Sequence, residues 1–141
     1  MGIIIGFSFI YSVKAFYTDF NIPFTNAKDA GYFLKSKVPD KVPIMTLNKF
    51  STTPVIGYAD RKFFYLPDGL TYSYFKWVEK VYLPTESELR LFAKYKGVGG
   101  LVIISDQKVD ENRFPSLKLW EAFDKENYKR ENYYIYTLTA Q

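Results

Sequence analysis

Residues 85–105 read TESELRLFAKYKGVGGLVIIS and join a helix to a buried strand. Thr85 and Glu88 form a capping-box pattern, in which the hydroxyl and the carboxylate each accept a hydrogen bond from the other residue's backbone amide. The apolar residues that follow are spaced as on one helical face, and Gly97 is a natural C-cap. Residues 101–104 are apolar at every position, as in a parallel strand that is covered on both faces. The stretch therefore predicts an α/β domain.

The rest of the chain alternates between helical and extended patterns. The predicted helices cover residues 27–34, 52–58 and 115–123, and the predicted strands cover residues 43–48, 63–66, 101–104 and 133–139. Residues 70–83 are aromatic and irregular, and the Tyr, Ile and Thr content of the last strand suits the edge of a sheet. This order predicts a three-layer α/β/α domain with a mostly parallel, Rossmann-like open sheet of about four strands.

The N-terminal segment is apolar, because residues 3–13 carry no charge. A spanning helix needs roughly 20 apolar residues, so these residues cannot cross a bilayer alone. Three interpretations stay open: a buried strand, a helix in the core, or the end of a transmembrane helix that begins upstream. The expected organisation is an apolar segment over 1–17, which the third interpretation makes a membrane-helix remnant, and a single α/β domain over 18–141.

Composition excludes several classes of enzyme. The 141 residues include no Cys and no His, so a thiol nucleophile, a Ser-His-Asp triad and the usual zinc sites are absent from the sequence. The net charge of +4 is spread evenly along the chain, with +2 on residues 1–60 and +2 on residues 61–141. Because this leaves no polybasic stripe in the sequence, a nucleic-acid partner is not expected. Neither a metal nor a cofactor is expected.

The carboxyl ends of the predicted strands are the first place to look for a site, because open parallel sheets bind ligands there. Asp68 follows one predicted strand and Asp106 follows another. Both aspartates are therefore candidate ligand-binding residues, although turn formation is the commoner use of Asp after a strand. The glycines of residues 97–100 come after a helix and before a strand, which is the reverse of a phosphate-binding loop.

An unusual share of the chain is aromatic: 13 Tyr, 13 Phe and 2 Trp. The densest run, residues 58–77, sets its rings beside basic side chains. Such a run suits a platform that stacks on sugar rings or docks on a partner, or else a strand and loop that cover one end of the sheet. The candidate ligand-binding residues are Tyr58, Arg61, Tyr65, Asp68, Tyr72, Trp77 and Asp106. No catalytic residue is assigned.

Four parts of the chain, residues 26–35, 43–44, 57–69 and 73–77, together resemble a known region. It is the extracytoplasmic domain that follows the membrane helices of multi-pass glycosyltransferases using polyprenyl-phosphate-linked sugars, of the protein mannosyltransferase and aminoarabinose transferase type. The resemblance covers residues 3–106. In that family the catalytic acids belong to early loops between membrane helices, and no position of this chain matches them.

The resemblance implies a membrane-associated, extracytoplasmic domain that performs no catalysis itself. Such a domain would assist the binding of a glycan or a polyprenyl-linked sugar acceptor, or dock against another domain, while residues 1–17 contact the membrane. The alternative is a stand-alone soluble α/β protein that binds a small molecule or a protein. Exposed aromatic residues would then favour a homo-oligomer.

Overall fold

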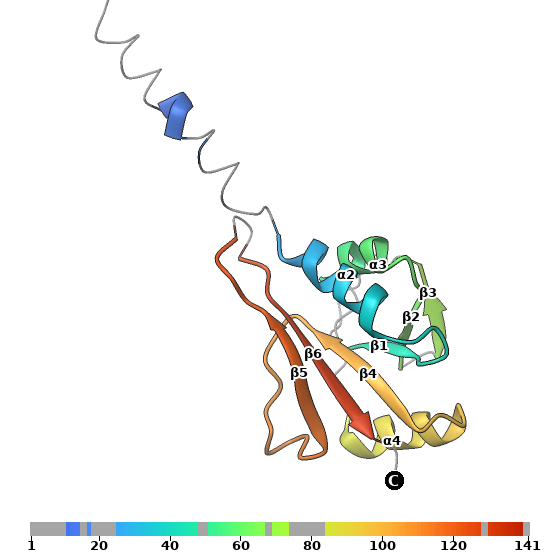
Figure 1. The fold of residues 1–141 in the computed structure, drawn as a ribbon. Coiled ribbons are helices and arrows are strands. Elements are labelled where there is room, and N and C mark those ends of the chain that lie inside the picture. The colour runs from blue at the N-terminus through green and yellow to red at the C-terminus, as the bar shows by residue number, and fades with distance from the viewer. Residues whose placement is uncertain are drawn as a thin grey trace, which may run out of the picture.

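The computed structural model describes residues 11–14, 17, 25–47, 51–66, 69–73, 84–127 and 130–139. In chain order the elements are α2 (Ala27–Lys37), β1 (Ile44–Thr46), α3 (Thr53–Ala59), β2 (Phe63–Tyr65), β3 (Leu70–Tyr72), α4 (Glu86–Tyr95), β4 (Gly100–Ser105), β5 (Leu117–Phe123) and β6 (Tyr133–Thr139) (Figure 1). The capping box predicted at the start of α4 is present, since Thr85 Oγ1 accepts from Glu88 N and Glu88 accepts from Thr85 N.

The sheet is mixed and has six strands in the order β3-β2-β1-β4-β6-β5. Only the pairings of β1 with β2 and with β4 are parallel; the other three pairings in the described sheet are antiparallel. The α/β character of the prediction is confirmed, but a mostly parallel sheet of about four strands is wrong. The additional strands are β3, in the stretch expected to be irregular, and β5.

The predicted helix over residues 115–123 is wrong, because these residues form β5. The backbone N–H of Ser116 donates to Glu86 Oε2 at 3.0 Å, which holds the start of this segment beside α4. Leu117 then pairs with Leu138 of β6. Trp120 is the extra residue of a register shift between Leu119 and Glu121, which breaks the alternation that would reveal a strand.

Strand β6 is an inner strand, so the prediction of an edge position is also wrong. It pairs with β4 on one side and with β5 on the other. Its residues alternate between the two faces of the sheet: Ile135 packs with the core under α2 and α3, and Tyr136 packs with the core under α4. The Tyr, Ile and Thr residues of 133–139 therefore belong to a strand that has a neighbouring strand on each side and a core on each face.

Two hydrophobic cores lie on opposite faces of the sheet, which gives the three layers that were expected. Helices α2 and α3 pack with Val102 and Ile104 of β4 on one face. Helix α4 packs with Leu101 and Ile103 on the other. Strand β4, apolar at successive positions, thus contributes side chains to both cores, and these side chains are almost wholly buried.

Few residues of the N-terminal segment are described. Residues 11–14 and 17 are helical, and all five are exposed. They belong to neither core, so for these residues burial in the domain, as strand or as helix, is not observed. No helix within the described parts of the chain has the length and apolar character that crossing a membrane requires.

The α2–α3 layer depends on one glycine. A Cβ placed on Gly31 of α2 would lie 2.4 Å from the Cβ of Tyr58 and 3.0 Å from the backbone N of Ala59, both on α3. Real carbon atoms do not approach so closely, and neither atom is the end of a flexible side chain. By contrast, a Cβ on Gly57 of α3 would meet nothing within 4 Å.

The same substitution should therefore have opposite effects at the two glycines. Gly57→Ala should raise the free energy of unfolding by about 0.5–1 kcal/mol, because alanine costs less backbone entropy in a helix. Gly31→Ala should lower it by about 1–3 kcal/mol, because α2 and α3 must separate. Urea denaturation of both variants measures this, and equal changes of the same sign would contradict the close packing of these helices.

Glu86 ties the start of α4 to the start of β5. Besides the bond from Ser116 N, its carboxylate accepts from Arg90 Nε at 3.0 Å, and Arg90 also donates to Ser116 Oγ. The backbone bond from Ser116, followed by its side-chain bond and the charge of Arg90, holds the pKa of Glu86 below its usual 4.5.

This lowered pKa makes part of the stability dependent on pH. Because the unfolded chain binds a proton at Glu86 more readily than the folded chain does, the stabilisation is present above pH 4.5 and is lost as the pH falls through the folded pKa. Glu86→Gln lacks that proton uptake. The variant should be less stable than the wild type at pH 5, and this difference in unfolding free energy should become smaller as the pH falls from about 5 to about 3. A deficit that stays constant over this range would refute the role of Glu86.

Candidate functional site

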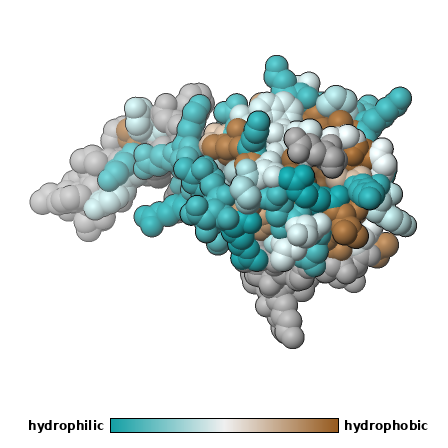
Figure 2. Space-filling model, turned by 90° about the horizontal axis from the view of Figure 1, so that it is seen from below, coloured by the Kyte–Doolittle hydropathy of each residue, from teal (hydrophilic) through white to brown (hydrophobic). Residues whose placement is uncertain are grey.

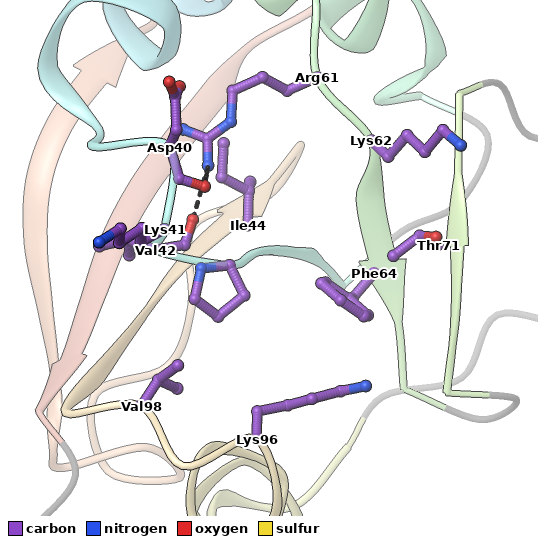
Figure 3. Close-up of a pocket in the computed structure, with 11 residues that line it drawn as sticks. Asp40, Lys41, Val42, Ile44, Arg61, Lys62, Phe64, Thr71, Lys96 and Val98 are labelled. Carbon is purple, nitrogen blue, oxygen red and sulfur yellow. Dashed lines mark hydrogen bonds between the residues drawn. The ribbon is translucent and has the colours of Figure 1, made fainter.

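A hollow lined by charged side chains lies at the edge of the sheet where the parallel strands begin. It measures about 490 Å3 and is lined by the segments before β1, β2 and β4. Its lining residues are Asp40, Lys41, Val42, Pro43, Ile44, Arg61, Lys62, Phe64, Thr71, Lys96 and Val98 (Figure 3). We call this hollow the amino-edge pocket. Four of its residues are cationic and one is a carboxylate.

Arg61 is a fixed part of the pocket wall. Its Nη1 donates to the carbonyl of Val38 at 2.9 Å, and its Nη2 donates to the carbonyls of Val42 at 2.7 Å and Asp40 at 3.1 Å (Figure 3). The guanidinium thus closes the loop between α2 and β1 onto the start of β2. A guanidinium cannot lose its proton in a protein, so this wall stays positively charged.

The three lysines stand on the rim of the pocket. In Figure 3 the ammonium groups of Lys41 and Lys62 point to opposite sides, and that of Lys96 lies beside Phe64. Lys96 Nζ is 4.8 Å from the centre of the Phe64 ring and 5.5 Å from that of Phe92. Within the described residues none of these lysines forms an ion pair with a carboxylate. Their flexible stems allow the ammonium groups to turn toward an anion.

A second hollow adjoins the amino-edge pocket on the outer side of α4. It measures about 580 Å3, is lined by Ser87, Arg90, Leu91, Lys94, Gly97, Val98 and Gly99, and shares Val98 with the first. We call the two hollows together the basic edge. Figure 2, a view from below Figure 1, shows mostly hydrophilic side chains on the described surface, with apolar ones between them.

The basic edge has more cations than carboxylates among its described lining residues. Six cationic residues and one carboxylate line it, a balance of +5, whereas the complete chain has +4. All other residues together therefore carry −1. Charges that are evenly spread along the sequence are therefore unevenly spread in the folded domain. The even spread in the sequence is thus no argument against a polyanionic partner at this edge.

The opposite edge, where the parallel strands end, holds a hydrogen-bonded network. Tyr133 OH donates to the carbonyl of Ser51 at 2.9 Å, and Glu131 Oε2 accepts from Thr25 Oγ1 at 2.8 Å. Asn26 Nδ2 donates to the carbonyls of Lys125 and Glu131. Burial, and next the charge of Glu131, raise the pKa of the Tyr133 hydroxyl far above its usual 10. These contacts hold the first residues of the domain against the β5–β6 loop.

The structure places the candidate ligand-binding residues in different parts of the domain. Arg61 lines the amino-edge pocket, whereas Asp106 follows β4 at the opposite edge. Tyr65 is buried, and Tyr72 packs against the same core. Tyr58 is exposed on α3, where its ring meets that of Tyr32 edge-on at 5.9 Å. Asp68 and Trp77 lie outside the described residues. A continuous aromatic platform is thus not formed by Tyr58, Tyr65 and Tyr72.

Sequence reasoning missed the lysines of the basic edge. Lys41, Lys62, Lys94 and Lys96 come from three distant segments, and each is an ordinary surface residue in its own segment. One signal in the sequence could have found three of them, because Lys41, Lys62 and Lys96 each come just before a predicted parallel strand. Parallel strands begin at the same edge, so that position predicts proximity.

Comparison of the chain with protein-family models, with curated proteins and with solved structures found no match. The described residues contain no group of three His, Cys, Asp or Glu side chains that could hold a metal ion. What the described basic edge offers a ligand is positive charge beside the aromatic ring of Phe64.

Replacing Arg61 tests whether the pocket wall is structural. Arg61→Ala leaves three carbonyls without their charged donor and should lower the unfolding free energy by about 2–4 kcal/mol. Arg61→Lys keeps the positive charge but lacks the several N–H donors of the guanidinium, so its loss of unfolding free energy should be smaller than that of Arg61→Ala but not zero. The neighbouring control Lys62→Ala should change stability by less than about 0.5 kcal/mol. Thermal or urea unfolding measures all three, and an Arg61→Ala variant as stable as Lys62→Ala would contradict this role.

Proposed function

We propose that the chain is a non-catalytic domain that binds the anionic group of a ligand in the amino-edge pocket. One observation carries the proposal: Lys41, Arg61, Lys62 and Lys96 line a hollow of about 490 Å3 whose described lining includes one carboxylate, that of Asp40. A phosphate or carboxylate entering it would gain several attractive charges and meet one repulsive charge.

The state of the cations supports this proposal. Arg61 is already ordered by three carbonyls, so binding an anion beside it costs little side-chain entropy. The lysines have no described salt bridge to break, and Lys96 rests on the face of Phe64, an attraction of about 0.5–1 kcal/mol at an exposed site. Because the pocket is open to water, each ion pair contributes only about 0.2–1 kcal/mol, and the affinity for a single anion should be modest.

The resemblance of residues 3–106 to a glycosyltransferase domain supports a proposal about the larger protein in which this binding would occur. We propose that the chain is the membrane-associated, extracytoplasmic domain of a membrane glycosyltransferase that uses polyprenyl-phosphate-linked sugars. In that setting the bound anion belongs to a glycan or to a lipid-linked sugar acceptor, and residues outside this chain perform the transfer. A stand-alone α/β binding protein, the alternative, would use the same pocket.

Binding of galacturonate, with neutral galactose as the matched ligand, tests the pocket directly. Titration followed by 15N–1H correlation spectra should move the amide signals of residues 41, 42, 44, 61–64 and 96–98 with galacturonate and leave them in place with galactose. The double variant Lys62→Ala/Lys96→Ala should weaken binding about fivefold, as expected for two exposed ion pairs.

The control for this experiment is Lys28→Ala/Lys118→Ala, which removes two exposed lysines of α2 and β5. It has the same net charge as the pocket variant and should bind galacturonate like the wild type. Shifts scattered over the whole domain, or an equal loss in both variants, would mean that the proposed pocket does not bind the anion.

A further inference from the structure

We infer that the ligand of the basic edge is a polyanionic saccharide that runs from the amino-edge pocket onto the outer face of α4. This inference rests on the proposed function, since it requires the pocket to bind an anionic group. It adds the class of ligand and a second binding surface. The observations behind it are the shape of the basic edge, its charge and its exposed side chains.

The shape of the basic edge favours an extended ligand. Val98 lines both hollows, and the segment between α4 and β4 contributes to both of them. Gly97 and Gly99, which line the second hollow, bring the backbone of this segment to the surface without side chains. A ligand confined to the first hollow would make no contact with the second, which measures about 580 Å3.

The charge of the basic edge favours several anionic groups on the ligand. Arg90 and Lys94 add two cations to the four of the first pocket, and the described lining of the second hollow includes no carboxylate. Arg90 is paired with Glu86, so Lys94 is the cation of this hollow that can meet a ligand without breaking a described ion pair. Because cations line both hollows, a ligand with repeated anions matches the surface better than a single anion does.

Exposed side chains on α4 favour a saccharide. Tyr95 is 82% exposed and Leu91 is 72% exposed, and neither belongs to a core. Lys96 Nζ lies 5.5 Å from the centre of the Tyr95 ring, so an aromatic face and an ammonium group stand side by side. This pair suits the apolar face of a sugar ring together with its carboxylate.

The placement of the two edges argues against the headgroups of an anchoring membrane. Thr25, where the described domain begins, is bound to Glu131 at the edge where the parallel strands end. The basic edge lies at the other end of these strands, where β1, β2 and β4 begin. If the chain is held to a bilayer from its N-terminal side, the edge that Thr25 joins faces the bilayer and the basic edge faces away from it.

A long oligogalacturonate tests the inference when it is compared with the galacturonate monomer by calorimetry at several salt concentrations. The oligomer should bind at least tenfold more tightly than the monomer, because it engages both hollows. Lys94→Ala and Tyr95→Ala should each weaken oligomer binding about threefold, while monomer binding stays unchanged. Lys118→Ala on β5 removes the same charge as Lys94→Ala away from the basic edge and should leave both affinities as in the wild type.

Each other outcome has a defined meaning. If monomer and oligomer bind equally and Lys94→Ala has no effect, the inference is overturned and the proposed function stands. If neither ligand binds, both are overturned. Tighter binding of oligothymidylate, or of vesicles containing phosphatidylglycerol, through Lys94 and Tyr95 would overturn the saccharide in favour of a nucleic acid or a lipid surface.

Discussion

The parallel pairing of β1 with both β2 and β4 is the constraint on which the rest of the structure depends. Parallel strands begin at one edge, so the loops that lead into them must meet there whatever their separation in sequence. In this chain these loops carry Lys41, Arg61, Lys62 and Lys96. The same pairing puts the ends of the strands at the opposite edge, where Thr25 and Glu131 join the start of the domain to the β5–β6 loop. One edge is thus free for a ligand, and the other holds the chain's entry point.

Close packing keeps the amino-edge pocket in place. Gly31 lets α3 approach α2, and this positions the segment between α3 and β2 from which Arg61 reaches the carbonyls of Val38 and Val42. On the other face, Glu86 and Arg90 attach α4 to Ser116 at the start of β5, while the end of α4 supplies Lys96. The cations of the basic edge therefore stand on a scaffold that is ordered before any ligand arrives.

Local signals in the sequence were sufficient for much of the fold and for little of the site. The capping box at Thr85 and the apolar residues 101–104 predicted α4 and β4, because caps and continuous apolar runs are local consequences of backbone geometry. Strand β5 was not predictable in this way, since its identity depends on pairing with the distant β6, and the bulge at Trp120 interrupts its alternation. Grouping side chains into a site has the same dependence on distant contacts. Tyr65 is part of the core, and the lysines lie near one another only because the sheet brings their segments together.

We propose that lysines from three separate segments form one surface that binds an anionic saccharide. Lysine footprinting tests this without any variant: the protein is acetylated with and without oligogalacturonate, and the modification of each lysine is quantified by mass spectrometry. We expect the ligand to protect Lys41, Lys62, Lys94 and Lys96 together, and Lys28, Lys108 and Lys118 to react at an unchanged rate. Equal protection of all exposed lysines, or protection of none, would contradict it.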